Sequence, residues 1–211
     1  MSFRFVLMLW CLLGLLPATA GAATVATPPT APVMLVLGDS ISAGYGLDAG
    51  QGWVFLLDQK LKSQGLAYKV VNASVSGETT AGGLARLPGL LTRHKPKIVL
   101  VELGGNDGLR ALPVKALRSN LEQMVDLSRK AGATPVMFEM RIPENYGPAY
   151  TQAFVRTFTG VSEERKVPMV PFLLMRFASD PKFFQDDGIH PSAAAQPQIL
   201  DAAWPTLQPL L

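Results

Sequence analysis

Short, uninterrupted apolar runs alternate with segments of helical periodicity along most of this chain, and this pattern constrains its fold more than any other feature. The runs are bounded by turn residues and cover 33–37, 69–72, 98–103, 135–140 and, more weakly, 167–170. Continuous apolar runs are typical of strands that are buried on both faces. Strands of this kind separated by helices predict one α/β domain, with a parallel sheet between two layers of helices.

The helical segments fill the intervals between the runs. They cover 53–61, 84–91, 117–128 and 150–161, and a final helix over 193–207 is expected to be interrupted by Pro197 and Pro205. In such folds, ligands bind beyond the carboxyl ends of the strands. The residues that follow each apolar run are therefore the first candidates for chemistry.

The N-terminal residues form a segment of a different kind. Arg4 is the only charged residue before Asp39, and an apolar run follows it and ends in small residues at Ala22. A basic start, a short apolar core and a small-residue end are typical of a secretory signal peptide. The apolar run is shorter than the roughly 20 residues of a bilayer span, so we do not expect a membrane anchor.

These features predict the organisation of the whole chain. Residues 1–22 are expected to be the signal peptide, with cleavage after Ala22 or, alternatively, after Ala20. Residues 23–32 are rich in Ala, Thr and Pro and are expected to form a flexible lead-in, while 33–211 form the folded domain. We therefore expect an exported protein that is periplasmic or secreted.

Composition excludes several classes of function. The only cysteine, Cys11, lies in the predicted signal peptide, so the mature chain should have no disulfide, thiol nucleophile or cysteine-based metal site. The two histidines are too few for a metal cluster, and neither a G-x-x-x-x-G-K-[ST] loop nor an early G-x-G-x-x-G is present. The formal net charge of +3 is spread along the chain without a basic stripe, which argues against nucleic acid as a partner. We expect no metal and no organic cofactor.

A serine follows the first apolar run in the sequence Gly38-Asp39-Ser40. A hydroxyl at the end of a strand and the start of a helix is exposed and lies where negative charge is favoured, as a nucleophile requires. Alternatively, Ser40 only caps the following helix. The G-x-S-x-G motif of another hydrolase fold is absent, because Ser42 occupies the position of its second glycine.

A carboxylate and an imidazole lie close together near the end of the chain. Asp187 precedes His190 by three residues with Gly188 between them, and a tight turn there would let the carboxylate orient the ring as a general base requires. The alternatives are a buried structural histidine and an aspartate that only stabilises a turn. The other histidine, His94, lies in a polar stretch and is interpreted as a solvated connector residue.

Two further loops follow predicted strands, at 72–79 and 104–108. Acyl transfer needs hydrogen-bond donors directed at the oxygen that becomes negative. The backbone N–H groups of Ser40 and Gly77 and the side-chain amide of Asn106 are candidates for these donors. Each loop alone could equally be a turn that requires special dihedral angles.

At these residues the chain resembles the SGNH (GDSL-type) hydrolases, and more narrowly the bacterial arylesterase and acyl-CoA thioesterase I / lysophospholipase group. The segments that carry the resemblance are Gly38-Asp39-Ser40, Asn72-Ala73-Ser74-Val75-Ser76-Gly77, Val101-Glu102-Leu103-Gly104-Gly105-Asn106-Asp107-Gly108 and Gln185-Asp186-Asp187-Gly188-Ile189-His190-Pro191. The resemblance implies a flavodoxin-like fold with about five parallel strands. It also implies that Ser40 is the nucleophile, that His190 is the base held by Asp187, and that Ser40, Gly77 and Asn106 form the oxyanion hole.

The resemblance predicts the reaction better than the substrate. Glu78 stands where relatives usually carry Asp, and the segment 109–113, a mobile substrate loop in relatives, has its own sequence here. We expect a monomeric esterase that acts on aryl or acyl esters, thioesters and lysolipids.

The apolar residues expected to contact the acyl chain are Leu109, Leu112, Ile142, Pro143 and Ile189, although ordinary packing would explain them equally well. The alternatives for the function are an O-acetyl esterase and a non-catalytic acyl-chain or glycan-binding protein.

Overall fold

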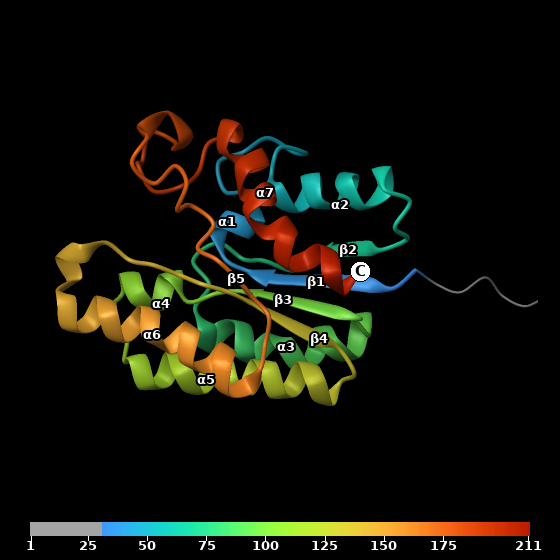
Figure 1. Ribbon diagram of the computed structural model, residues 1–211, viewed down its shortest axis with the longest axis horizontal. Coiled ribbons are helices and arrows are strands. Elements are labelled where there is room, and N and C mark those ends of the chain that lie inside the picture. Colours follow the sequence, from blue (N-terminus) through green and yellow to red (C-terminus); the bar gives the residue numbers. More distant parts are fainter. Residues whose placement is uncertain (1–30) are drawn as a thin grey trace, which may run out of the picture. The chain divides into compact units, whose positions relative to one another are not determined.

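Residues 31–211 are described by the structure, a computed structural model, and they form a five-stranded parallel sheet with helices on both faces (Figure 1). The strands are β1 (Val33–Gly38), β2 (Lys69–Asn72), β3 (Ile98–Glu102), β4 (Thr134–Phe138) and β5 (Met169–Val170). Their order across the sheet is β2-β1-β3-β4-β5, and every neighbouring pair is parallel. The predicted α/β fold with about five parallel strands is confirmed.

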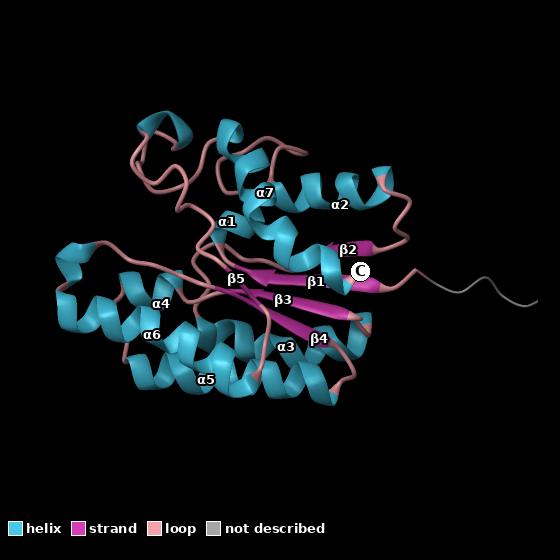
Figure 2. Cartoon of the chain, in the orientation of Figure 1, coloured by secondary structure: helices cyan, strands magenta, loops and turns pink. Residues whose placement is uncertain are grey.

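Seven α-helices and four short 3₁₀ helices accompany the strands within these residues. The α-helices are α1 (Ser40–Ala43), α2 (Trp53–Ser63), α3 (Thr80–His94), α4 (Gly105–Leu109), α5 (Val114–Lys130), α6 (Pro148–Arg165) and α7 (Gln196–Leu207). The 3₁₀ helices are η1 (Glu144–Tyr146), η2 (Pro181–Phe183), η3 (Ala193–Ala195) and η4 (Gln208–Leu210). Helices α2 and α7 cover one face of the sheet, and α3, α5 and α6 cover the other (Figure 2).

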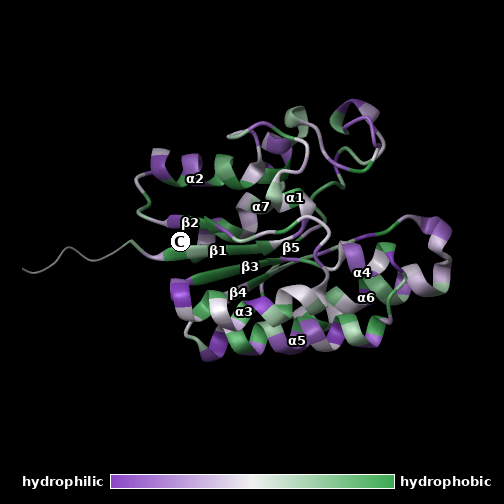
Figure 3. Cartoon of the chain, turned by 180° about the vertical axis from the view of Figure 1, so that it is seen from behind, coloured by the Kyte–Doolittle hydropathy of each residue, from purple (hydrophilic) through white to green (hydrophobic). Residues whose placement is uncertain are grey.

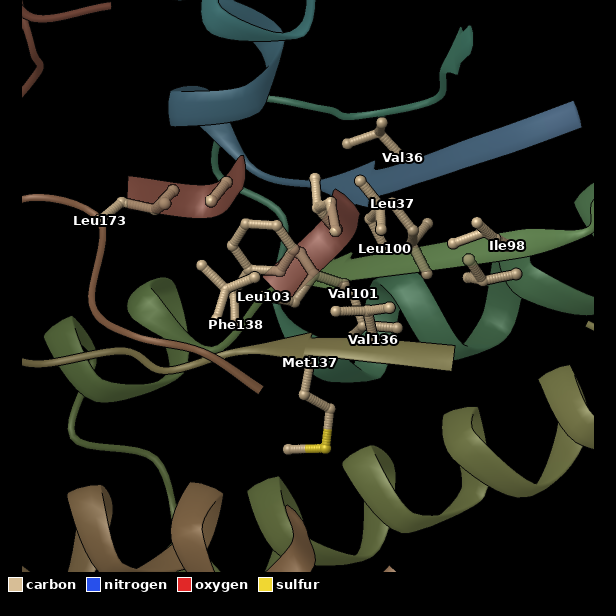
Figure 4. Packing of buried hydrophobic residues seen from close by; sticks show 14 of the residues in the cluster. Val36, Leu37, Ile98, Leu100, Val101, Leu103, Val136, Met137, Phe138 and Leu173 are labelled. Atoms are coloured by element: carbon tan, nitrogen blue, oxygen red, sulfur yellow. The ribbon is translucent and has the colours of Figure 1, made fainter. Parts of the chain in front are cut away.

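The core lies on both sides of the central strands, which explains why their sequences are apolar without alternation. All of β3 is buried, and so is β1 after its first residue. The central strands are hydrophobic along their length, whereas the helices mix hydrophobic and hydrophilic residues (Figure 3). Leu37, Val101 and Phe138 come from three adjacent strands and lie together in this core (Figure 4). The edge strand β2 is only partly buried, in keeping with its shorter apolar run.

The strand order creates the place where a site can form. The chain leaves β1 through α2 to reach β2 on one side, and then returns through α3, on the opposite face, to reach β3 on the other side of β1. Loops that diverge in this way leave a crevice at the carboxyl ends of the strands. Helices α1 and α4 begin directly after β1 and β3, at this end of the sheet (Figure 1).

Three expectations about local structure were wrong. The last helix is not interrupted, because Pro197 lies in the first turn of α7, where an N–H has no helical partner, and Pro205 lies only two residues before its end. His94 is not in a connector but is the last residue of α3, which begins at Thr80 because Thr79 caps it. The short helix α4 was not expected, because five residues contain too little periodicity to be seen.

The predicted signal peptide, residues 1–22, and most of the lead-in, residues 23–32, lie outside the described residues. Within residues 31–211 no helix is both long enough and apolar enough to span a bilayer.

Candidate active site

Ser40 lies at the first position of α1, immediately beyond the end of β1. The cap of this helix is Asp39, whose Oδ1 atom accepts a hydrogen bond of 3.0 Å from the N–H of Ile41. The helix ends after four residues at Gly44, which adopts a left-handed conformation (φ 73°). Because Asp39 caps the helix, the Ser40 hydroxyl is not used for capping and is available for other contacts.

A chain of hydrogen bonds joins Ser40, His190 and Asp187, which are up to 150 positions apart in the sequence. The Nε2 atom of His190 lies 3.0 Å from Oγ of Ser40, and its Nδ1 atom lies 2.6 Å from Oδ2 of Asp187. The other carboxylate oxygen, Oδ1, accepts from the N–H groups of Ile189 and His190, both at 2.9 Å. Gly188, with φ 67°, makes the tight turn that brings the carboxylate back to the ring.

The environment of Asp187 determines which nitrogen of His190 carries the proton. The hydrogen bond from the His190 ring and the two backbone N–H groups lower the pKa of Asp187 from 3.8 to about 2. Asp187 is therefore a carboxylate at neutral pH and accepts the Nδ1–H of His190. This leaves the lone pair of Nε2 facing the Ser40 hydroxyl, which is the arrangement needed for proton transfer from the hydroxyl.

Two residues to which the sequence assigned no role hold the histidine loop against the segment that follows α1. Gln185 donates from its backbone N–H to the carbonyl of His190 (2.8 Å) and from Nε2 to the carbonyls of Tyr45 (2.7 Å) and Pro191 (3.1 Å). The ring of Tyr45 lies against the imidazole, with 4.5 Å between ring centroids. The proximity of Gln185 to His190 in the sequence was a signal for its role, but nothing in the sequence connected Tyr45 to this loop.

The three candidate oxyanion donors are Ser40, Gly77 and Asn106, and they come from the ends of β1, β2 and β3. The Nδ2 group of Asn106 donates to Oδ2 of Asp39 (3.2 Å), which orients the amide and leaves its second N–H available. Gly77 has φ 77°, a conformation that other residues rarely adopt, and its carbonyl accepts a hydrogen bond from Arg110 (2.9 Å). Both loops are therefore held in defined conformations.

The loop that carries Asn106 is also anchored from below. The side chain of Asp107 is buried, and it accepts hydrogen bonds from the N–H (2.8 Å) and the hydroxyl (2.5 Å) of Thr80. Asn120 donates to the same hydroxyl (3.0 Å). These contacts join α4 to the start of α3 and to α5, so the amide of Asn106 stands on a rigid support.

A pair of buried carboxyl groups lies beneath Ser40, and nothing in the sequence indicated that the two groups meet. Glu102, the last residue of β3, is fully buried, and its Oε2 atom accepts from the hydroxyl of Ser42 (2.6 Å) and the N–H of Asp39 (3.3 Å). Burial raises the pKa of Asp39 from 3.8 to about 6. Burial, and then the nearby charge of Asp39, raise the pKa of Glu102 well above its ordinary value.

The predicted acyl-binding residues lie in two places. Leu109 and Leu112 are exposed, at 42% and 36%, and the hydroxyls of Tyr146 and Tyr150 each donate to one of their carbonyls at 2.8 Å. Ile189 is 57% exposed, next to His190 in the chain.

Ile142 and Pro143 belong to the segment that follows β4. Ile142 is partly buried against the core and packs against Gly108, so ordinary packing explains it, whereas Pro143 is exposed at the start of η1. The structure thus leaves Leu109, Leu112, Pro143 and Ile189 accessible. Within residues 31–211, no three His, Cys, Asp or Glu side chains are grouped as a metal site would require.

Comparisons with known proteins agree on one family. The model of the GDSL-like lipase/acylhydrolase family matches residues 36–196. The chain is 50% identical to the esterase TesA of Pseudomonas aeruginosa over 181 residues, which are 86% of this chain and 90% of that protein. It is 45% identical to thioesterase 1/protease 1/lysophospholipase L1 of Escherichia coli K12 over 181 residues, 86% of each protein. The crystal structure of the psychrotrophic esterase EstA from Pseudoalteromonas, inhibited by monoethylphosphonate, superposes with a TM-score of 0.81 at 41% identity, over 84% of this chain and 97% of that one.

Proposed function

The chain belongs to the GDSL-like lipase/acylhydrolase family, and we propose that it is a serine esterase in which Ser40 is the nucleophile, His190 the general base and Asp187 the residue that orients it. The reaction is the hydrolysis of carboxylic esters through an acyl-enzyme intermediate. The observation that carries this proposal is the continuous hydrogen-bonded chain from the Ser40 hydroxyl through His190 to Asp187.

In the first step, Oγ of Ser40 attacks the ester carbonyl carbon while Nε2 of His190 takes the hydroxyl proton. The carbonyl oxygen becomes an oxyanion, and the N–H groups of Ser40 and Gly77 and the free N–H of Asn106 are the donors that we assign to it. His190 then gives its proton to the leaving alkoxide as the bond between carbon and the alcohol oxygen breaks. The products are an alcohol and an acyl group bonded to Ser40.

In the second step, His190 takes a proton from a water molecule, whose oxygen attacks the acyl carbon. The same donors hold the second oxyanion, and the bond to Oγ of Ser40 breaks as His190 returns the proton to that oxygen. The carboxylic acid is released and the hydroxyl of Ser40 is restored. The carboxylate of Asp187 stabilises the imidazolium that forms in both steps.

The substrates that we propose are aryl and acyl esters, with thioesters and lysophospholipids as further members of the same class. The activities for which the relatives are named, esterase and thioesterase/lysophospholipase, support this range. The exposed side chains of Leu109, Leu112 and Ile189 offer apolar contacts for an acyl chain beside the reaction site. We also propose export to the periplasm or the medium, on the signal-peptide pattern of residues 1–22.

The test is hydrolysis of p-nitrophenyl esters from acetyl to palmitoyl by the mature protein and by its Ser40→Ala variant. We expect activity on the longer esters and a loss of at least about 10³-fold in Ser40→Ala, because removal of the nucleophile leaves only binding and oxyanion stabilisation. Ser63→Ala, at an exposed serine in α2, is the matched control and should retain full activity.

A fluorophosphonate probe should label Ser40 and leave the Ser40→Ala variant unlabelled. Equal activity in the wild type and in folded Ser40→Ala would contradict the assignment of the nucleophile. Activity confined to the acetyl ester would contradict the lipid-ester substrates and indicate an O-acetyl esterase instead.

A further inference from the structure

The buried carboxyl group of Glu102 has no part in the proton transfers described above, yet it touches the residues on both sides of the nucleophile. A single atom, Oε2, accepts from the N–H of Asp39 (3.3 Å) and from the hydroxyl of Ser42 (2.6 Å). Ser40 lies between these two residues in the chain. We propose that Glu102 is a positioning residue that fixes the turn carrying Ser40, and through Asp39 the amide of Asn106. The proposal rests on the assignment of Ser40 as nucleophile.

The packing at the end of β1 shows how closely Glu102 is fitted to this turn. Gly38 and Glu102 are register partners on the adjacent strands β1 and β3. A Cβ atom at Gly38 would lie 2.6 Å from Oε2 of Glu102 and 2.7 Å from Cβ of Ser42. No side chain fits in this space, so the glycine of the Gly38-Asp39-Ser40 sequence is required for Glu102 to reach the turn.

The connection continues from Asp39 to the oxyanion donors. The N–H of Asp39 is held by Glu102, and its side chain caps α1 through Ile41 and holds Nδ2 of Asn106. A movement of Asp39 would therefore displace the N–H of Ser40 and the amide of Asn106 together. Displacements of about 1 Å in such groups can lower turnover by about 10²-fold.

Stability does not account for an acid at this position. Among the described residues no cation lies within ion-pair distance of Glu102, and its second oxygen, Oε1, is buried without a hydrogen-bond partner. An unpaired buried polar atom lowers stability, and an apolar side chain of similar volume would avoid that loss. The acid is instead explained by the two donors that Oε2 receives.

The contacts of Glu102 determine which variant is the correct control. In the two hydrogen bonds that hold the turn, its Oε2 atom acts only as an acceptor. Burial, and then the charge of Asp39, raise the pKa of Glu102 well above its ordinary value, while Asp107 and His190 act on Asp39 from α4 and from the histidine loop. Glutamine keeps the shape of the side chain and an acceptor oxygen, so Glu102→Gln is the conservative variant.

The experiment compares Glu102→Leu, Glu102→Gln, Ser42→Ala and the double variant Glu102→Leu/Ser42→Ala in the mature enzyme. Turnover and KM are measured on one p-nitrophenyl ester. The inhibition constant of a boronic acid, which is a transition-state analogue, is measured for each variant as well. Circular dichroism shows whether each variant is folded. We expect Glu102→Leu to lower kcat by about 10–100-fold with less than about 3-fold change in KM, and to weaken the analogue in the same proportion. Glu102→Gln should stay within about 3-fold of the wild type.

The double variant tests the route of the effect. If Glu102 acts through Ser42 and the Asp39 amide, the loss in the double variant should be much smaller than the product of the two single losses. Purely additive losses would contradict this route. If Glu102→Leu does not fold, Ser42→Ala decides the question, with an expected loss in kcat of about 3–10-fold.

Three results would overturn the positioning role. They are unchanged kcat in folded Glu102→Leu or in Ser42→Ala, an effect on KM alone, and a loss in Glu102→Gln as large as that in Glu102→Leu. Labelling of Ser40 by a fluorophosphonate in the wild type separates this proposal from the one on which it rests. Failure of labelling in an active wild type would contradict the nucleophile assignment, whereas normal labelling with unaffected Glu102 variants would contradict only the role of Glu102.

Discussion

Two aspartates lie in the candidate active site, Asp39 beside Ser40 in the chain and Asp187 against the ring of His190, and the fold gives them opposite properties. Asp187 is exposed and accepts three hydrogen bonds, which lower its pKa to about 2. Asp39 is buried beside a second acid, and burial raises its pKa to about 6 although it also accepts two hydrogen bonds. The same type of side chain thus has a lowered pKa on the rim of the site, at Asp187, and a raised pKa in its floor, at Asp39.

The difference shows what each part of the site does. The rim, formed by the loop with Asp187 and His190, carries the groups to which we assign proton transfer, and an ionised carboxylate there favours the imidazolium. The floor, formed by Asp39, Ser42 and Glu102, holds backbone and amide donors in place, for which an acceptor is needed but a charge is not. We therefore expect changes in the rim to affect turnover most, and changes in the floor to affect turnover less and stability more.

The largest effect is expected from Asp187→Asn. The asparagine can no longer fix the Nδ1–H tautomer of His190 or stabilise the imidazolium, so kcat should fall by about 10³–10⁴-fold. Thermal unfolding should change much less than turnover, because the side chain is exposed and solvent screens the stabilisation that its hydrogen bonds give. Steady-state kinetics and a melting curve measure both quantities. A loss in kcat of less than about 10-fold would contradict the role assigned to Asp187.

A smaller loss is expected from Asn106→Ala, which connects the two regions. Removal of one oxyanion donor typically lowers kcat by about 10²–10³-fold, with little change in KM. Asn120→Ala removes a nearby amide that donates only to the hydroxyl of Thr80, in the support of this loop, and should lower kcat less than Asn106→Ala does. Near-normal turnover in folded Asn106→Ala would show that its amide does not contact the oxyanion.

The smallest effect, and the one most specific to the floor, is the pH dependence of stability in Asp39→Asn. Between the ordinary pKa of 3.8 and about 6, the folded protein binds the proton of Asp39 more tightly than the unfolded chain does. Lowering the pH from 7 to 4 should therefore stabilise the wild type relative to Asp39→Asn, by up to about 3 kcal/mol. For Asp187 the sign is opposite, since its stabilisation is present above about pH 4 and is lost as the pH falls toward 2.

Urea unfolding at pH 4, 5, 6 and 7 measures the predicted difference for Asp39. Asp201→Asn changes the formal charge by the same amount at an exposed position of α7 and serves as the control for net charge. If the difference in unfolding free energy between the wild type and Asp39→Asn does not change with pH, the pKa of Asp39 is not raised in the folded protein.

The succession of strands and helices along the chain and the candidate residues of the rim could be predicted from the sequence, because both depend on local patterns. Continuous apolar runs mark buried strands, and the spacing of Asp187 and His190 around Gly188 is that of a single turn. Glu102 and Tyr45 could not be predicted in the same way. The contacts of Glu102 are made with residues about 60 positions away, and those of Tyr45 with the ring of His190 near the other end of the chain.

The sequence by itself determined the class of fold, the family and the candidate residues for the chemistry, since periodicity and short motifs reside in the order of the residues. Only the tertiary structure decided how acidic each carboxyl group is and which donors it meets. A pKa depends on burial and on neighbouring charges, and both arise when strands distant in the chain, such as β1 and β3, are brought side by side.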